Sequence, residues 1–202
     1  MLTIALPKGR IADETLDRFE KAFGEKFVFE DRKLILEKSG FKFLNVRNQD
    51  VPTYVMHGAA DLGVVGLDVL EEKEYDLIKL LDLKLGRCKV AFGLRAGEKL
   101  NFDKSKITIA TKHEKIAKKY FEQKAMAVEI IKLYGSIELA PLVGLCDYTV
   151  DIVETGETMK QNGLEVGPTI METTAHLIAN KNSFYAKKEL IFDLKDKLEK
   201  YL

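Results

Sequence analysis

The chain has 202 residues, of which 32 are Lys or Arg and 32 are Asp or Glu, so its formal net charge at pH 7 is zero. This length allows one large domain or two smaller lobes with a sizeable core. Balanced charge argues against non-specific binding to nucleic acid or to a membrane, so an anionic substrate must be held by a local basic cluster.

The sequence also bears on the compartment. No segment approaches the length of a transmembrane span, and no signal peptide precedes the first strand-like run. Cys88 and Cys146 lie far apart in apolar surroundings, which is typical of reduced core residues rather than of a catalytic thiol. We therefore expect a cytoplasmic protein.

The first half of the chain alternates predicted strands and helices. In order, we expect a strand at 2–6, a loop at Pro7–Arg10, a helix to Phe23, strands at 33–37 and 40–46 flanked by Arg32 and Arg47, a helix after Asp50, a buried strand at 60–66 and a helix after Asp68. Lys8 and Arg10 are interpreted most simply as charges of a solvated turn, and Arg32 and Arg47 as surface charges. Asp50 and Asp68 are interpreted as helix caps.

The second half repeats the alternation after residue 87. We expect strands at 88–94, 107–111, 128–133 and 148–153, helices at 114–124 and 137–144, a strand-like or irregular segment at 169–179 and an amphipathic helix at 186–202. The Lys-rich outer face of the 114–124 helix is interpreted as solvated surface.

Such alternation indicates a largely parallel α/β architecture. We expect two lobes with a cleft between them: residues 1–87, to which 180–202 return, and residues 88–179. Ligands of such folds bind at the carboxyl ends of strands, so the loops that follow strands are the candidate site.

One loop carries the clearest chemical signal, the one that follows the predicted strand at 148–153. Thr155, Gly156 and Thr158 can leave backbone N–H groups pointing into a concavity, and Thr158 with Gln161 forms a predicted capping box at a helix start. Such a junction is a phosphate cradle. Asp151 and Glu154 beside it favour a ligand that also carries hydroxyls, such as ribose 5-phosphate. The local pattern leaves a second reading open, a satisfied core acid followed by an ordinary turn.

Other chemistries lack support. His57, His113 and His176 are scattered, without the spacing of a metal site, and are interpreted as surface or packing residues. No P-loop and no Gly-x-Ser-x-Gly motif is present.

Five strings in order along the chain resemble the catalytic ATP phosphoribosyltransferases of histidine biosynthesis. They are Leu6–Arg10, Asp50–Val55, Gly58–Gly66, Lys132–Pro141 and Asp151–Thr158. The resemblance implies a fold like that of the type II periplasmic binding proteins. It also implies a Mg²⁺-dependent reaction of ATP with phosphoribosyl pyrophosphate, which gives N1-(5-phosphoribosyl)-ATP and pyrophosphate.

The resemblance also implies roles for particular residues. Arg10 and Arg32 would be catalytic and hold the pyrophosphate together with Mg²⁺, and no side chain is expected to form a metal site of its own. Asp151 and Glu154 would bind the ribose hydroxyls. The 5-phosphate would be held by Thr155, Gly156, Glu157 and Thr158. Weaker candidates for contacts with the nucleotide or pyrophosphate are Lys8, Gly9, Arg47 and Glu138.

With 202 residues the chain resembles the short form of this family, and we expect it to lack the C-terminal regulatory domain of the long form. The resemblance therefore implies a separate regulatory subunit similar to histidyl-tRNA synthetase, along with self-association. Two alternatives are a solute-binding module without catalysis and a salvage phosphoribosyltransferase that acts on a free base. The latter would carry two adjacent acids before its loop, whereas Asp151 and Glu154 are separated by two apolar residues.

Overall fold

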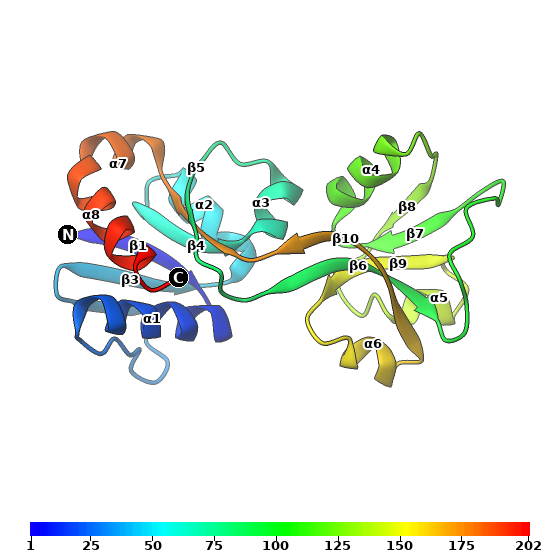
Figure 1. Ribbon diagram of the computed structural model, residues 1–202, viewed down its shortest axis with the longest axis horizontal. Helices are drawn as coiled ribbons and strands as arrows, with labels where there is room; N and C mark the ends of the chain where they lie inside the picture. The colour runs from blue at the N-terminus through cyan, green and yellow to red at the C-terminus, as the bar shows by residue number, and fades with distance from the viewer. The chain divides into compact units, whose positions relative to one another are not determined.

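A computed structural model describes all residues from 1 to 202. The chain divides into unit 1, residues Met1–Gly86 and Thr174–Leu202, and unit 2, residues Arg87–Thr173 (Figure 1). The predicted alternation of strands and helices is confirmed in both units. None of the helices combines the length and apolar character needed to cross a membrane.

Unit 1 is built on a six-stranded sheet in the order β2-β3-β1-β4-β11-β5. Its strands are β1 (Leu2–Pro7), β2 (Ile35–Lys38), β3 (Phe41–Val46), β4 (Leu62–Gly66), β5 (Ile78–Asp82) and β11 (Ala175–Ala179). Strand β1 runs parallel to β3 and to β4, whereas β11 is antiparallel to both of its neighbours. The ends of β1, β3 and β4 therefore lie at one edge of the sheet.

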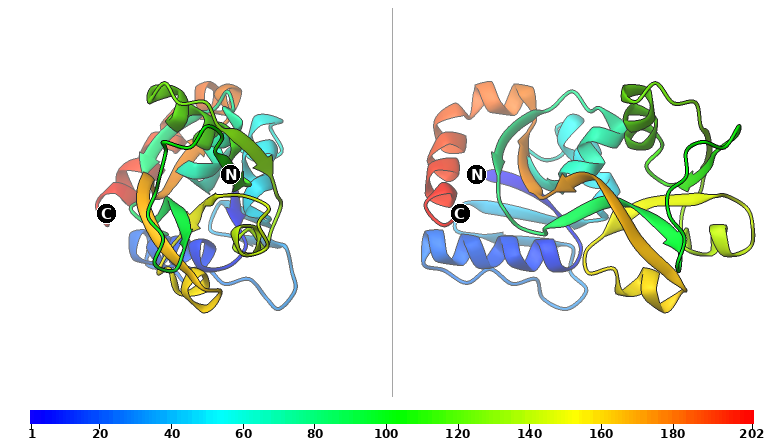
Figure 2. Two further views of the ribbon diagram at one scale, coloured as in Figure 1. Left: turned by 90° about the vertical axis from the view of Figure 1, so that its right-hand side faces the viewer. Right: turned by 45° about the vertical axis from the view of Figure 1, so that its right-hand side comes forward.

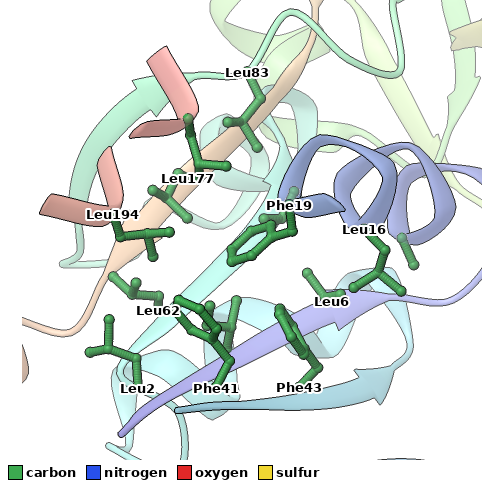
Figure 3. Packing of buried hydrophobic residues seen from close by; sticks show 14 of the residues in the cluster. Leu2, Leu6, Leu16, Phe19, Phe41, Phe43, Leu62, Leu83, Leu177 and Leu194 are labelled. Atoms are coloured by element: carbon green, nitrogen blue, oxygen red, sulfur yellow. The ribbon is translucent and has the colours of Figure 1, made fainter. Parts of the chain in front are cut away.

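Helices cover both faces of this sheet because its buried strands are apolar on both sides. Helices α1 (Arg10–Phe23) and α8 (Lys188–Glu199) pack on one face, and α2 (Val51–Met56) and α3 (Leu67–Lys73) on the other. Phe19 of α1 projects onto the sheet, where its ring meets Phe41 and Phe43 edge-on at centroid distances of 5.4 and 5.1 Å (Figure 3). This contact fixes α1, and with it the loop that precedes α1.

Unit 2 has a five-stranded sheet in the order β10-β6-β9-β7-β8. Its strands are β6 (Cys88–Arg95), β7 (Thr108–Thr111), β8 (Glu129–Lys132), β9 (Tyr148–Val153) and β10 (Leu164–Thr173). Helix α4 (Glu114–Gln123) lies on one face and α6 (Glu157–Gln161) on the other (Figure 2). Phe121 of α4 and Met159 of α6 are buried in these contacts. The short α5 (Leu139–Leu142) packs beside Ala110 of β7.

The domain boundary expected after residue 179 is wrong. The strand-like segment at 169–179 is two strands in different sheets: β10 pairs with β6 of unit 2, and β11 pairs with β4 and β5 of unit 1. Both stretches have the same extended, apolar character, so the point where the chain changes sheet is set by the pairing partners.

Two elements of unit 1 were not expected from the sequence. Strand β5 is only half-buried, with a charged side chain at Lys79, so it lacks a continuous apolar run. Helix α7 (Lys181–Ala186) precedes α8 and has no buried residue, but Asn180 caps it by accepting a hydrogen bond from the Ser183 N–H.

Candidate active site

The strand order of unit 2 places a topological switch point between β7 and β9. After β7 the chain passes to β8 on one side, then returns to β9 on the other side of β7. Strands β7 and β9 are parallel, with Thr111 opposite Val150, so the residues that follow both strands emerge at the same edge. Open α/β sheets bind their ligands at such an edge.

A cavity of about 180 Å³ lies over the junction of β9 and α6. Gly156 shapes it, because its φ of +82° is a left-handed conformation that favours glycine. A Cβ at this position would also lie 2.7 Å from the Val166 side chain. The predicted loop residues Glu154, Thr155, Gly156 and Thr158 line the cavity, together with Glu138 from the residue before α5; Glu157 is not among its lining residues.

The predicted capping box at this junction is wrong. Helix α6 begins at Glu157, Gly156 occupies the N-cap position, and no side chain caps the helix. The Gln161 side chain instead donates a hydrogen bond within the helix, from its Nε2 to Glu157 Oε1 at 3.1 Å. Since α6 has only five residues, any anion here would depend on individual N–H groups more than on a helix dipole.

Asp151 is 8% exposed, and its carboxylate is held by neighbouring residues. Its Oδ1 lies 2.9 Å from Lys112 Nζ, accepts the Ile152 N–H at 2.7 Å, and is 3.7 Å from His113 Nε2. Asp151 is therefore a partnered core acid that stands at the switch point. The sequence left open whether Asp151 is a ligand-binding acid or a satisfied core acid, and a carboxylate with these partners at a strand end is compatible with both.

Lys112 and His113 were not identified as site residues from the sequence. His113 is buried, in line with a packing histidine, but it packs next to Asp151. Lys112 directly follows β7 and precedes the Lys-rich helix α4, whose lysines suggest a solvated surface. The signal that could have identified Lys112 is its position directly after β7, a strand that runs parallel to β9, which contains Asp151.

The corresponding edge of unit 1 gathers the other candidates. Lys8, Gly9 and Arg10 follow β1, and Arg47 follows β3, with the Lys8 N–H donating to the Val46 carbonyl at 2.8 Å. Gly9 has a φ of +94° and lets α1 begin directly at Arg10. Arg10 is exposed, with its Nε 3.7 Å from Glu14 Oε1.

Arg32 approaches the same edge by a different route. It lies in the turn before β2, which is antiparallel to β3, and the Asn45 N–H donates to the Leu34 carbonyl at 2.8 Å. This register brings the start of β2 to the end of β3, where Arg47 lies. The Arg32 side chain is exposed and forms no ion pair, so its charge remains available to an anion.

The two expected aspartate caps are wrong in different ways. Asp50 does occupy the N-cap position of α2, but its side chain accepts no capping hydrogen bond. Gly66 occupies the N-cap position of α3, and Asp68 is buried within the first turn of that helix.

Comparisons of the sequence and of the structure with known proteins indicate the same enzyme family. Residues 47–200 match the family model described as HisG: ATP phosphoribosyltransferase. An ATP phosphoribosyltransferase from Wolinella succinogenes is 66% identical over 200 residues, which cover 99% of this chain and 97% of that protein. The structure titled ATP phosphoribosyl transferase (HisG:HisZ) complex from Thermotoga maritima superposes with a TM-score of 0.82 at 36% identity, covering 99% of this chain and 98% of the other.

A more distant similarity concerns the fold alone. The substrate-binding protein of an amino acid ABC transporter superposes with a TM-score of 0.61 at 12% identity, covering 98% of this chain and 91% of the other. The expected likeness to periplasmic binding proteins is confirmed. This likeness does not support the solute-binding alternative, because proteins that share a fold can have different functions.

Proposed function

The chain belongs to the ATP phosphoribosyltransferase family, which catalyses the first step of histidine biosynthesis, and we propose how its own residues divide that reaction. The enzyme transfers the 5-phosphoribosyl group of phosphoribosyl pyrophosphate to N1 of ATP and releases pyrophosphate. Its 202 residues, which span nearly the whole length of the curated relatives, fit the short form of the family.

The junction of β9 and α6 would hold the phosphoribosyl group. Asp151 and Glu154 would accept hydrogen bonds from the ribose hydroxyls, and Thr155, Gly156, Glu157 and Thr158 would hold the 5-phosphate. The observation that carries this proposal is the cavity at the switch point, shaped by the left-handed Gly156. Successive backbone N–H groups in such a turn form a concavity that binds anions, although here the Glu157 N–H also donates to Thr155 Oγ1 at 3.3 Å.

Arg10 and Arg32 would hold the departing pyrophosphate. Adenine N1 already has a lone pair, so the enzyme mainly has to position the substrates and stabilise the charge that develops on the leaving group. Guanidinium groups suit this task because they stay charged and bind phosphate through two parallel hydrogen bonds. Further contacts with the nucleotide or pyrophosphate would come from Lys8, Gly9, Arg47 and Glu138.

Mg²⁺ would arrive bound to the substrate phosphates. No three His, Cys, Asp or Glu side chains form a group that could hold a metal ion. Glu138 and Glu154 line the same cavity and could contact a hydrated Mg²⁺ on the substrate, since carboxylate oxygens suit this cation. When bound, the ion would neutralise part of the charge on the pyrophosphate.

A regulatory subunit similar to histidyl-tRNA synthetase would complete the enzyme, along with self-association of this chain. The support is the similarity to the Thermotoga maritima protein, whose structure is titled as a HisG:HisZ complex. ATP and phosphoribosyl pyrophosphate are intracellular metabolites, which supports the expected cytoplasmic location.

An ultraviolet assay with ATP, phosphoribosyl pyrophosphate, Mg²⁺ and pyrophosphatase tests the function, with mass spectrometry of the product. It is run with and without the synthetase-like subunit from the same source, and with adenine replacing ATP as a control. We expect phosphoribosyl-ATP from ATP and no product from adenine. If the protein binds ATP but forms no phosphoribosyl-ATP, either with or without the synthetase-like subunit, the proposed function is contradicted.

A further inference from the structure

Lys112 contacts the acid that we assign to the ribose hydroxyls. Its Nζ lies 2.9 Å from Asp151 Oδ1, and the two side chains are 33% and 12% exposed, so water screens this ion pair only in part. Lys112 directly follows β7 at the switch point, and Asp151 lies near the end of the parallel neighbour β9. The pair therefore connects two adjacent strand ends of the candidate site.

The contacts of Asp151 are unevenly divided between its oxygens. Lys112 Nζ, the Ile152 N–H and His113 Nε2 all approach Oδ1. Since Lys112 and the Ile152 N–H occupy Oδ1 and hold the carboxylate in place, Oδ2 is the oxygen left to accept a hydrogen bond from a ligand hydroxyl. A carboxylate anchored through one oxygen is pre-organised for such a contact.

The charge around the cavity also calls for a cation. Glu138 and Glu154 line the cavity, and Asp151 directly precedes the lining residue Ile152 in β9. A phosphate group adds about 1.5 to 2 negative charges at pH 7, and like charges at close range oppose its binding. Lys112 counters this repulsion because its charge lies directly against Asp151.

We propose that Lys112 is a positioning residue for phosphoribosyl transfer. It holds Asp151 so that Oδ2 faces the ribose hydroxyls, and it offsets the acidic charge beside the 5-phosphate. This inference rests on the proposed function, because it takes the β9–α6 junction as the phosphoribosyl site. Lys112 itself does not need to touch the reacting atoms.

The test is steady-state kinetics of the wild type, Lys112→Met and Lys112→Arg, with the synthetase-like subunit present. For Lys112→Met we expect kcat/KM for phosphoribosyl pyrophosphate to fall about 10- to 100-fold, as misplaced binding groups do, with the KM for ATP within about twofold of wild type. Lys112→Arg keeps the charge and should recover most of the loss. Lys118→Met is the matched control, because Lys118 is an exposed lysine of the same unit that pairs only with Glu122 at 3.8 Å.

A double-mutant cycle with Asp151→Asn separates positioning from general damage. If Lys112 acts through Asp151, the double variant should lose less than the product of the two single losses, by about fivefold or more. Wild-type kinetics for Lys112→Met, or equal losses for both substrates with a lowered melting temperature and no rescue by Arg, would overturn the inference. Failure of the wild type to form phosphoribosyl-ATP would instead contradict the proposed function.

Discussion

One buried carboxylate adds polar contacts to the apolar packing that attaches the C-terminal helices to unit 1, and Lys187→Met tests its contribution. Asp61, just before β4, accepts hydrogen bonds from Lys187 Nζ at 2.7 and 2.8 Å, from Ser183 Oγ at 2.7 Å and from the Thr3 N–H at 2.9 Å. These bonds join the first strand, the centre of the sheet and the α7–α8 segment.

The size of the effect follows from the burial of the two partners. Removing one member of a buried ion pair costs about 3–5 kcal/mol. The Lys187 side chain is 38% exposed against 9% for Asp61, so water weakens the pair, and Asp61 keeps its bonds from Ser183 and Thr3. We therefore expect a loss of about 1–2 kcal/mol in the free energy of unfolding. For a chain of this size, that lowers the melting temperature by about 3–6 °C.

The effect should depend on pH in a defined direction. Burial raises the pKa of Asp61, but the hydrogen bonds from Lys187, the Thr3 N–H and Ser183 outweigh it, so the net pKa is lowered. A group of this kind stabilises the fold above its unfolded pKa, about 4, and the contribution is lost as the pH falls through the folded pKa. The difference between wild type and Lys187→Met should be full at pH 7 and should narrow below about pH 4.

The measurement is thermal unfolding followed by circular dichroism at pH 7 and at a series of acidic pH values. Lys200→Met is the control, because Lys200 is exposed near the end of the same helix and forms no ion pair. The control should stay within about 0.5 kcal/mol of wild type. A wild-type melting temperature for Lys187→Met at pH 7, or a difference that persists unchanged in acid, would refute the reasoning.

Three further predictions concern the site and the sheet of unit 1. Arg10→Ala or Arg32→Ala should lower kcat by about 10²- to 10³-fold and raise KM less, because the arginines act on the leaving group; steady-state kinetics with unchanged kcat and raised KM would contradict this. Gly156→Ala should raise the KM for phosphoribosyl pyrophosphate and destabilise the fold by about 1–3 kcal/mol, since φ is +82° and Val166 lies 2.7 Å from the new Cβ. Adding Val166→Ala should restore only part of the affinity and of the stability, because it removes the contact with Val166 but not the strain of the positive φ. Wild-type kinetics and a wild-type melting temperature for Gly156→Ala alone would contradict this loop geometry. Burial raises the pKa of Asp82, but its hydrogen bonds bring it down to about 2. Asp82→Asn should therefore lower the free energy of unfolding by about 1–2 kcal/mol at pH 7 and by progressively less between pH 4 and pH 2. Unfolding curves at several pH values measure this loss. An equal loss at pH 2 would show that the ionised Asp82 carboxylate is not its source.

Much of the candidate site is readable from the sequence because its loops carry local signals. Gly9 and Gly156 both adopt positive φ at the start of a helix, and each follows an apolar strand that the sequence predicts within a residue or two. A strand, a glycine and a helix start are neighbours along the chain, so their pattern survives without knowledge of the fold. The capping box at Thr158 was misread because Gly156, in a left-handed conformation, starts the helix earlier than the side-chain pattern indicates.

The sequence by itself determined the order of the elements except for β5 and α7, the loops that follow the predicted strands and the side chains those loops carry. Only the tertiary structure decided that Lys112 meets Asp151, because the two belong to strands that become neighbours through their pairing, far apart along the chain. It also decided that the extended run from Leu164 to Ala179 divides between two sheets. Local patterns record whether a residue suits a strand and a buried face, whereas the choice of partner strand is made by distant residues that compete for the same backbone hydrogen bonds.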